Sequence, residues 1–355
     1  MIRILSVTVA CLMPVIFSLA AETQADQKEL TGSHVPSLEV PDDPNGNADV
    51  ISDLAFSPDS KILAVAYGRF RGLLQKPSPG MAIVWDIKSG KRLATFDSFK
   101  DGVSSVVFSG DGKYLAAGGY DGSLQIWHVT DWSRQISVNF NSESVTALDF
   151  SPNNASLAVG TMLWAEDSRK PNLHLYQVST GREIKSLRCP AESVIGVDFL
   201  PDGKSLICAG MSGVVQDWDI EAGTSRTIFQ SKDLMLFSMA LSHDGKLIVA
   251  GGDPIHYKHK KWQVQIWDTE SGKLFQKKTE PGQMLSTVRF SPDARWLVIA
   301  SREAKVKLWN PSTEQLIDIT NTGIDVAFSP DGKLLALANG NKVTFLDIEK
   351  LLDQE

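Results

Sequence analysis

The sequence predicts an all-β fold, a seven-bladed β-propeller in which each blade is a four-stranded antiparallel sheet. A similar stretch recurs seven times along the 355 residues, at an average period of about 45 residues. Each copy places turn residues between apolar runs, which is typical of short strands. A single four-stranded sheet cannot bury both of its faces, whereas a ring of sheets buries them against one another.

The clearest copy is FSPDGKLLALANG, from Phe328 to Gly340. Ser329 and Pro330 suit the first two positions of a type I turn, and Gly332 accommodates the left-handed backbone that leaves it. The apolar run that follows lacks polar alternation, which indicates a strand covered on both faces. The other copies begin at Phe56, Phe108, Phe150, Phe199, Leu241 and Phe290.

The second copy illustrates the four strands, named a to d from first to last. We expect them at 103–108, 114–119, 123–129 and 134–140, separated by Gly- and Asp-containing turns.

The last copy lacks its outer strand, because the chain ends soon after the third one. Residues 34–40 alternate in polarity, and we expect them to complete blade 7 and so protect its edge. The propeller is then predicted over residues 34–350, preceded by a flexible segment at 21–33 and followed by a tail at 351–355.

The N-terminus has the pattern of a secretory signal peptide at residues 1–20. Arg3 precedes an apolar run that reaches Ala20, and the next charged residue is Glu22. The alternative is an uncleaved anchor of similar length. We therefore expect an exported chain, periplasmic or extracellular, without a membrane span once the signal is removed.

Net charge limits the class of partner that the chain can bind, and the cysteine content bears on disulfide formation. The net charge of −7 argues against a general nucleic-acid binder, which needs a basic face. Export permits disulfides, and Cys189 and Cys208 remain after the signal. A bond between them and two separate thiols both stay open.

The third strand of each copy ends in a recurring dipeptide, Trp-Asp at residues 85–86, 218–219 and 267–268, with variants in the other four. Turns such as Ser-Gly-Lys at 89–91 follow it. In these features the chain resembles the WD-repeat propellers, although Phe99 and Asn141 stand where that family usually has His in two copies. The resemblance implies a rigid, non-catalytic platform for interaction, with no cofactor.

Three long loops join strands b and c in blades 1, 3 and 5, at residues 69–80, 161–172 and 253–262. They are rich in basic and aromatic residues, which are typical interface anchors. We expect this face to bind a protein or peptide partner, acidic in character, or an anionic glycan; self-association stays open. The alternative is that the loops are solvated, or that their aromatics pack inward. The candidate contact residues are Arg69, Phe70, Arg71, Lys76, Trp164, Arg169, Lys170, His256, Tyr257, Lys258, Lys260, Lys261 and Trp262.

A second group lies on the innermost strands, one or three residues before the anchor of each copy. Because strand side chains alternate, these positions share one side of strand a. We expect them to line the central channel, either as ordinary solvated lining or as a site for a cation or small polar ligand. They are Asp53, Asp149, Asp198, Arg289 and Asp325.

Catalytic and metal-binding motifs are scarce. The chain has no GxSxG, HExxH or paired CxxC motif, and the pair His256 and His259 lacks an evident third ligand, so no metal site is expected. The rival hypothesis is a lactonase-like or hydrolytic propeller that uses channel carboxylates. We expect a binding scaffold rather than an enzyme.

Overall fold

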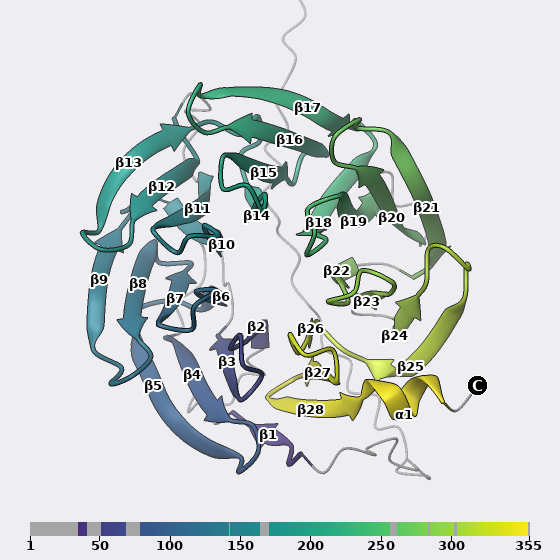
Figure 1. Cartoon of the computed structure of the whole chain (residues 1–355), viewed down its shortest axis with the longest axis horizontal. Helices are drawn as coiled ribbons and strands as arrows, with labels where there is room; N and C mark the ends of the chain where they lie inside the picture. Colours follow the sequence, from purple (N-terminus) through teal and green to yellow (C-terminus); the bar gives the residue numbers. More distant parts are fainter. Residues whose placement is uncertain are drawn as a thin grey trace, which may run out of the picture.

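The computed structural model describes residues 35–40, 51–68, 79–141, 143–163, 170–255, 261–282, 285–301 and 304–353. Seven four-stranded antiparallel sheets stand around a central opening (Figure 1). In each blade the strands follow chain order from the channel outwards, apart from the closing strand of blade 7. The predicted fold class is confirmed.

Blades 1 to 4 contain sixteen strands. Blade 1 has β2 (Ile51–Phe56), β3 (Ile62–Tyr67), β4 (Gly80–Asp86) and β5 (Lys91–Phe99); blade 2 has β6 (Val103–Phe108), β7 (Tyr114–Gly119), β8 (Ser123–His128) and β9 (Arg134–Asn139); blade 3 has β10 (Glu143–Phe150), β11 (Ser156–Leu163), β12 (Leu173–Gln177) and β13 (Arg182–Leu187); blade 4 has β14 (Val194–Phe199), β15 (Ser205–Gly210), β16 (Val214–Asp219) and β17 (Thr224–Gln230).

Blades 5 to 7 complete the ring. Blade 5 has β18 (Leu234–Leu241), β19 (Leu247–Pro254), β20 (Lys261–Asp268) and β21 (Leu274–Pro281); blade 6 has β22 (Leu285–Phe290), β23 (Leu297–Ser301), β24 (Ala304–Trp309) and β25 (Leu316–Thr322); blade 7 has β26 (Asp325–Phe328), β27 (Leu334–Asn339), β28 (Lys342–Asp347) and the N-terminal β1 (Leu38–Glu39).

Strand β1 closes the ring, as the sequence predicts. It pairs antiparallel with β28, with Leu38 opposite Val343. The Val40 amide also donates to the carbonyl of Asn341 at 2.8 Å. Leu38 is 1% exposed and packs in the apolar core between blades 7 and 1. The first and last parts of the propeller are therefore held together without a covalent link.

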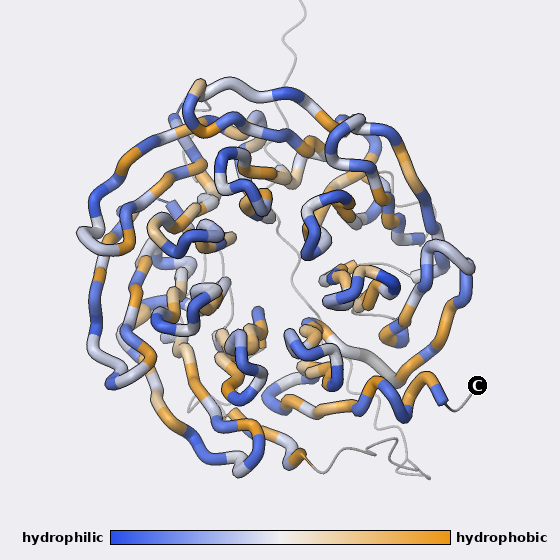
Figure 2. Tube along the Cα trace, viewed as in Figure 1, coloured by the Kyte–Doolittle hydropathy of each residue, from blue (hydrophilic) through white to orange (hydrophobic). Residues whose placement is uncertain are grey.

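The apolar cores lie between blades. Side chains from neighbouring blades share each core; for example, Ala82 of blade 1 packs in one cluster with Leu115 of blade 2. Hydrophilic residues gather at the turns (Figure 2). This explains the apolar strand b, since both of its faces are covered.

The a–b turns are stabilised locally. In blade 7 the Ser329 hydroxyl donates to Asp331 at 2.6 Å and accepts from the Leu334 amide at 2.9 Å. Gly332 has a φ of +72°. Equivalent turns in blades 1 and 6 place Ser60 and Ala294 in this left-handed conformation, where a side chain costs free energy.

On the outer side of the ring, hydrogen bonds join several of the blades to the blade that follows. A side chain on strand d donates to backbone carbonyls in the c–d turn of the following blade. Arg226 does so to Thr269 at 2.5 Å and Glu270 at 2.7 Å, and Lys185 does so to Ile220 and Glu221. Gln135 and Gln276 make similar contacts at 3.2 and 3.4 Å.

The structure pairs Cys189 with Cys208 in a disulfide, with 6.7 Å between their Cα atoms. Both residues are fully buried in the core shared by blades 3 and 4. The alternative of two separate thiols is therefore not the one observed.

The C-terminus differs from the predicted tail. Residues Ile348–Leu352 form helix α1, whose N-cap is Asp347. Leu351 is buried in the core shared by blades 6 and 7. Sequence periodicity misses this helix because it spans only five residues. Across the described ranges, no helix has the length and hydrophobicity needed to cross a bilayer.

Candidate functional site

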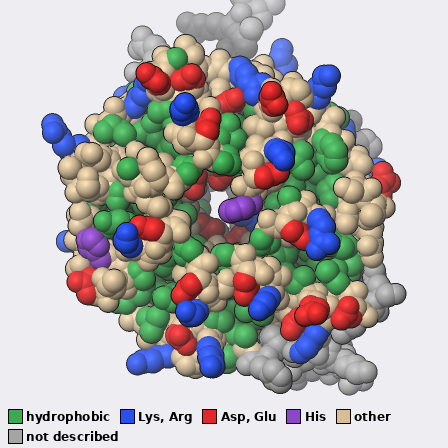
Figure 3. Space-filling view, in the orientation of Figure 1, with side chains coloured by type: hydrophobic (Ala, Val, Ile, Leu, Met, Phe, Trp, Pro, Cys, Tyr) green, Lys and Arg blue, Asp and Glu red, His purple; other side chains and the backbone are tan. Residues whose placement is uncertain are grey.

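The central channel contains a cavity of about 410 Å³. Its walls come from the strand nearest the axis in every blade, namely β2, β6, β10, β14, β18, β22 and β26. Figure 3 shows the channel opening at the centre of the ring, with acidic side chains visible inside it. The structure brings five predicted channel residues to this cavity: Asp53, Asp149, Asp198, Arg289 and Asp325.

Three of the carboxylates connect neighbouring blades. Asp149 accepts a hydrogen bond from the Phe199 amide at 2.7 Å, and Asp198 accepts one from the Leu241 amide at 2.9 Å. Asp53 accepts one from the Val106 amide at 2.9 Å. The innermost strand of each blade is a sheet edge with unpaired amides, and these carboxylates satisfy some of them. Sequence analysis misses this role because it depends on the neighbouring blade.

Hydroxyl groups form a second set of connections. Ser104 donates to the Val145 carbonyl at 2.5 Å, and Thr146 donates to the Val194 carbonyl at 2.6 Å. Ser52 makes the equivalent bond to Val103. These hydroxyls stand four residues before the anchor in blades 1, 2 and 3, and this regular spacing is visible in the sequence.

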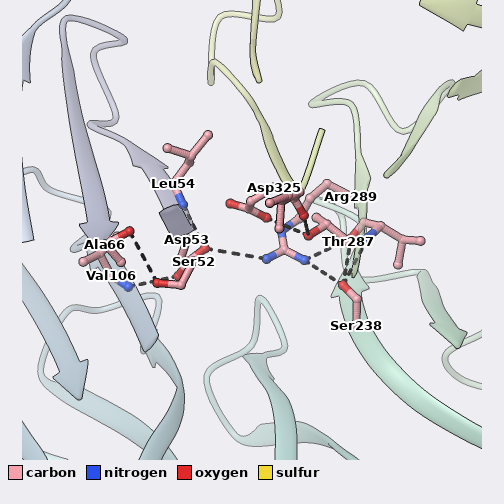
Figure 4. A network of polar contacts seen from close by, with 11 residues as sticks. Ser52, Asp53, Leu54, Ala66, Val106, Ser238, Thr287, Arg289 and Asp325 are labelled. Atoms are coloured by element: carbon pink, nitrogen blue, oxygen red, sulfur yellow. Dashed lines mark hydrogen bonds and ion pairs between the residues drawn. The ribbon is translucent and has the colours of Figure 1, made fainter. Parts of the chain in front are cut away.

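Arg289 provides the only cationic side chain among the described cavity residues (Figure 4). Its Nη1 donates to the Ser238 hydroxyl and to the Val288 carbonyl, both at 3.0 Å. Its Nη2 lies 3.9 Å from Asp53 Oδ1. The guanidinium is therefore held mainly by blades 5 and 6, with a weak ion pair across to blade 1.

Asp325 lies beside this group on β26. Its Oδ1 accepts a hydrogen bond from the Thr287 hydroxyl at 2.7 Å. Its Oδ2 is buried and has no hydrogen-bond partner among the described residues. The residue is only 3% exposed.

Burial raises the pKa of all four channel carboxyls. The pKa of Asp325 is raised to about 7 by burial and by the nearby Asp53, although Arg289 opposes the shift. Burial raises the pKa of Asp198 to about 6 against the opposing effect of Arg289. The pKa of Asp149 is raised well above its ordinary value by burial and by Asp198, and burial also raises that of Asp53. The raised pKa values favour the neutral, protonated form of these carboxyls.

The arrangement does not resemble a metal centre. The described part of the chain contains no group of three His, Cys, Asp or Glu side chains placed to hold a metal ion. The carboxylates belong to different blades, and their oxygens are partly used by backbone amides.

Most of the predicted partner-binding residues lie outside the described ranges. Two described lysines, Lys170 and Lys261, are exposed on the face that carries the b–c loops. Ten predicted contacts have no described position: Arg69, Phe70, Arg71, Lys76, Trp164, Arg169, His256, Tyr257, Lys258 and Lys260.

The inclusion of Trp262 in the loop surface is wrong. Strand β20 already begins at Lys261, so the loop is shorter than the sequence suggests. Trp262 is 1% exposed and packs with Val264 and Leu285 in the core shared by blades 5 and 6. It is unavailable to a partner because it fills the space between two blades.

Blades 3 and 5 project further than the others on the b–c side. Their a and b strands contain eight residues each, whereas those of blades 1, 2 and 4 contain six. Residues 161–163 and 253–254, which the sequence assigns to loops, belong to these longer hairpins. The extra residues pair with the early parts of β10 and β18.

Phe99, which stands where WD-repeat propellers usually have His, is part of an apolar core. Phe99 is 1% exposed, and its ring centre lies 6.4 Å from that of Trp127. The indole nitrogens of Trp85, Trp218 and Trp309 are buried without a hydrogen-bond partner among the described residues. Phe99 and Trp127 thus contribute to the apolar core shared by blades 1 and 2.

Comparison with known proteins agrees with this architecture. The family described as "WD domain, G-beta repeat" matches residues 90–128 and 275–310. The chain is 21% identical over 316 residues to "Periodic tryptophan protein 2 homolog" of Caenorhabditis elegans, covering 87% of this chain and 32% of that protein. It is 29% identical over 205 residues to "Protein groucho" of Drosophila melanogaster, covering 56% of this chain and 24% of that protein. The chain thus spans a third or less of these relatives. The chain is thus similar to WD-repeat proteins in parts of its sequence and has the seven four-stranded blades of a β-propeller.

Proposed function

We propose that this chain is an exported, non-catalytic interaction scaffold. It binds a protein or anionic ligand through the face that carries the b–c loops of blades 1, 3 and 5. The observation that carries the proposal is the pair of extended hairpins, β10–β11 and β18–β19, whose strands contain eight residues each and lengthen blades 3 and 5 on the b–c side.

Charge supports this choice of face. The b–c loops contain an excess of Lys and Arg in a chain whose net charge is −7. On the opposite face the a–b turns neutralise their own charges, since Lys61 pairs with Asp59 at 3.2 Å and Lys113 with Asp111 at 3.1 Å. An acidic partner is therefore attracted to the loop face more than to the turn face.

Export is supported by two independent features. The N-terminal sequence has the pattern of a signal peptide. The Cys189–Cys208 disulfide is of a kind that persists in oxidising compartments.

The channel carboxylates favour a scaffold over the rival enzyme. A hydrolase uses such groups as acid and base, and it needs them free to reach a substrate. Here Asp53, Asp149 and Asp198 each accept a backbone amide of the next blade, which accounts for their positions without catalysis.

The test is affinity capture from a cell-envelope extract, followed by binding of the purified partner. The variant replaces Arg69, Arg71, Lys258, Lys260 and Lys261 with Ala. A matched control replaces five cations of the turn face, namely Lys61, Lys113, Lys246, Arg295 and Lys333. The proposal expects the partner to be lost only in the loop variant, with both variants folded. Equal binding by the two variants would reject the loop face.

A further inference from the structure

We propose that the Cys189–Cys208 disulfide and the side chain of Asn172 form a clamp that positions the b–c loop of blade 3 for binding. This inference deepens the proposed function and rests on it, since the same loop belongs to the proposed binding face. The clamp acts on the described ends of the loop, residues 161–163 and Asn172, through residues 188–193, the linker between blades 3 and 4.

Asn172 fastens the C-terminal end of the loop to this linker. The residue is fully buried and lies directly before β12. Its Oδ1 accepts a hydrogen bond from the Cys189 amide at 2.9 Å, and its Nδ2 donates to the carbonyls of Cys189 at 3.2 Å and Ala191 at 2.5 Å. The Asn172 carbonyl in turn accepts from the Thr161 amide at 2.9 Å, which joins the two ends of the loop. The loop base therefore depends on the position of Cys189.

The N-terminal end of the loop is held by the same linker. The Leu163 amide donates to the Glu192 carbonyl at 2.9 Å. Met162 forms an isolated antiparallel bridge with Ser193. The linker thus contacts both ends of one loop, and its own position decides where the loop stands.

The disulfide fixes the linker to blade 4. Cys208 lies in β15, an inner strand of the blade 4 sheet that pairs with β14 and β16. Both cysteines are fully buried in the core shared by blades 3 and 4, which stand side by side in the ring (Figure 1). A methyl group at Gly210 of β15 would overlap Ala191, so glycine lets the linker lie close to this strand. The position of a rigid strand is thereby transmitted to the blade 3 loop.

Blade 5 supplies an internal comparison. Its hairpin β18–β19 has strands as long as those of β10–β11, but the blade contains no cysteine. There the Ile255 amide donates to the carbonyl of Asp233, just before β18, at 2.9 Å. The Ile255 amide should therefore not respond to loss of the disulfide.

The first test is amide hydrogen exchange of the full chain, measured by NMR at single residues. The variants are Cys189→Ala with Cys208→Ala, and Asn172→Ala, which keeps the disulfide. Exchange at Leu163 is expected to rise at least about tenfold in both, because the bonds that hold the loop end open more often. Exchange at Ile255 is expected to change by less than about twofold.

An unchanged rate at Leu163 in either variant overturns the clamp. Equal acceleration at Leu163 and Ile255 also overturns it, because the bond would then stabilise the ring as a whole. If one variant does not fold, the other decides.

The second test measures binding of fluorescent poly-L-glutamate, an acidic peptide, at low salt. Asn172→Ala is expected to bind it at least about threefold more weakly than the unchanged chain, because a loosened loop loses more conformational entropy on binding. Equal affinity, together with faster exchange at Leu163, would overturn the role of the clamp in binding.

Failure of the proposed function has a different signature. The variant that replaces the five loop cations would then bind the peptide as tightly as the unchanged chain, or neither would bind. The exchange rates at Leu163 and Ile255 decide on the clamp in either case, because they need no partner.

Discussion

The carboxylate of Asp149 in blade 3 accepts a 2.7 Å hydrogen bond from the backbone amide of Phe199 in blade 4. This contact joins two strands that face the channel and share no sheet. Asp53 and Asp198 repeat it at other blade junctions. Acidic residues that suggest a ligand site thus also hold the inner ring together, and the consequences can be measured.

Asp149→Ala is expected to lower the free energy of unfolding by about 1–2 kcal/mol, because it leaves the Phe199 amide without its acceptor. Asp149→Asn keeps an acceptor oxygen and removes a buried charge, so it should be neutral or stabilising. Urea denaturation of both variants measures the difference. Equal destabilisation by Ala and Asn would show that charge, rather than the hydrogen bond, matters.

Asp325→Asn is expected to stabilise the protein at high pH. The pKa of Asp325 is raised to about 7 in the folded chain, above the value of 3.8 expected when unfolded. The protonated group therefore contributes stability that is complete below about pH 4 and is lost as the pH rises through about 7. The variant does not titrate, so its advantage should be about 1 kcal/mol or more at about pH 8 and near zero at about pH 4.

Melting temperatures at the two pH values test this. The charged groups that act on the Asp325 carboxyl are Asp53 and Arg289. The control is Asp97→Asn, which removes an exposed carboxylate on the outer strand β5 and shows the general effect of losing one negative charge. An advantage that is larger in acid would contradict the assignment.

Replacement of Cys189 and Cys208 by Ala is expected to cost about 3 kcal/mol, because the bond closes a loop of 19 residues. Loss of the bond frees the unfolded chain more than the folded one. Chemical denaturation measures the cost, and thiol titration of the unmodified protein under denaturing conditions should find neither thiol free. Detection of both thiols would refute the pairing.

Ala294→Gly is expected to stabilise blade 6 by about 1 kcal/mol or less. Ala294 has a φ of +56°, where Gly112 and Gly332 stand in equivalent turns. Relief of the left-handed strain outweighs the extra freedom of glycine in the unfolded chain. Gly332→Ala is the reciprocal control and should lower the melting temperature. A fall with Ala294→Gly would mean that the turn is not strained.

Leu38→Ala is expected to cost about 2–4 kcal/mol, as for other buried leucines. Leu38 holds the closing strand in the core between blades 7 and 1. Loss of β1 exposes the edge of β28, so aggregation on heating should rise as well. Light scattering and denaturation check both effects, with the exposed Glu39→Ala as control. Equal behaviour of the two variants would show that the closing strand adds little.

The sequence by itself determines the blades, because the features that specify them are local. Turns such as Ser329 to Gly332 and apolar runs such as Leu334–Asn339 specify a strand, a reversal and a strand without reference to the rest of the chain. Even the closing strand is predictable, since blade 7 lacks one strand and the alternation at residues 35–40 supplies it.

The tertiary structure decides what individual side chains do. Trp262 stands at the end of a basic, aromatic stretch, yet the contact between blades 5 and 6 buries it. Asp149 belongs to a pattern that points to the channel, yet its hydrogen bond goes to the next blade. Cys189 and Cys208 meet because adjacent blades share a core. Sequence periodicity describes one blade at a time, whereas these roles depend on the distance between two blades, which only the closed ring determines.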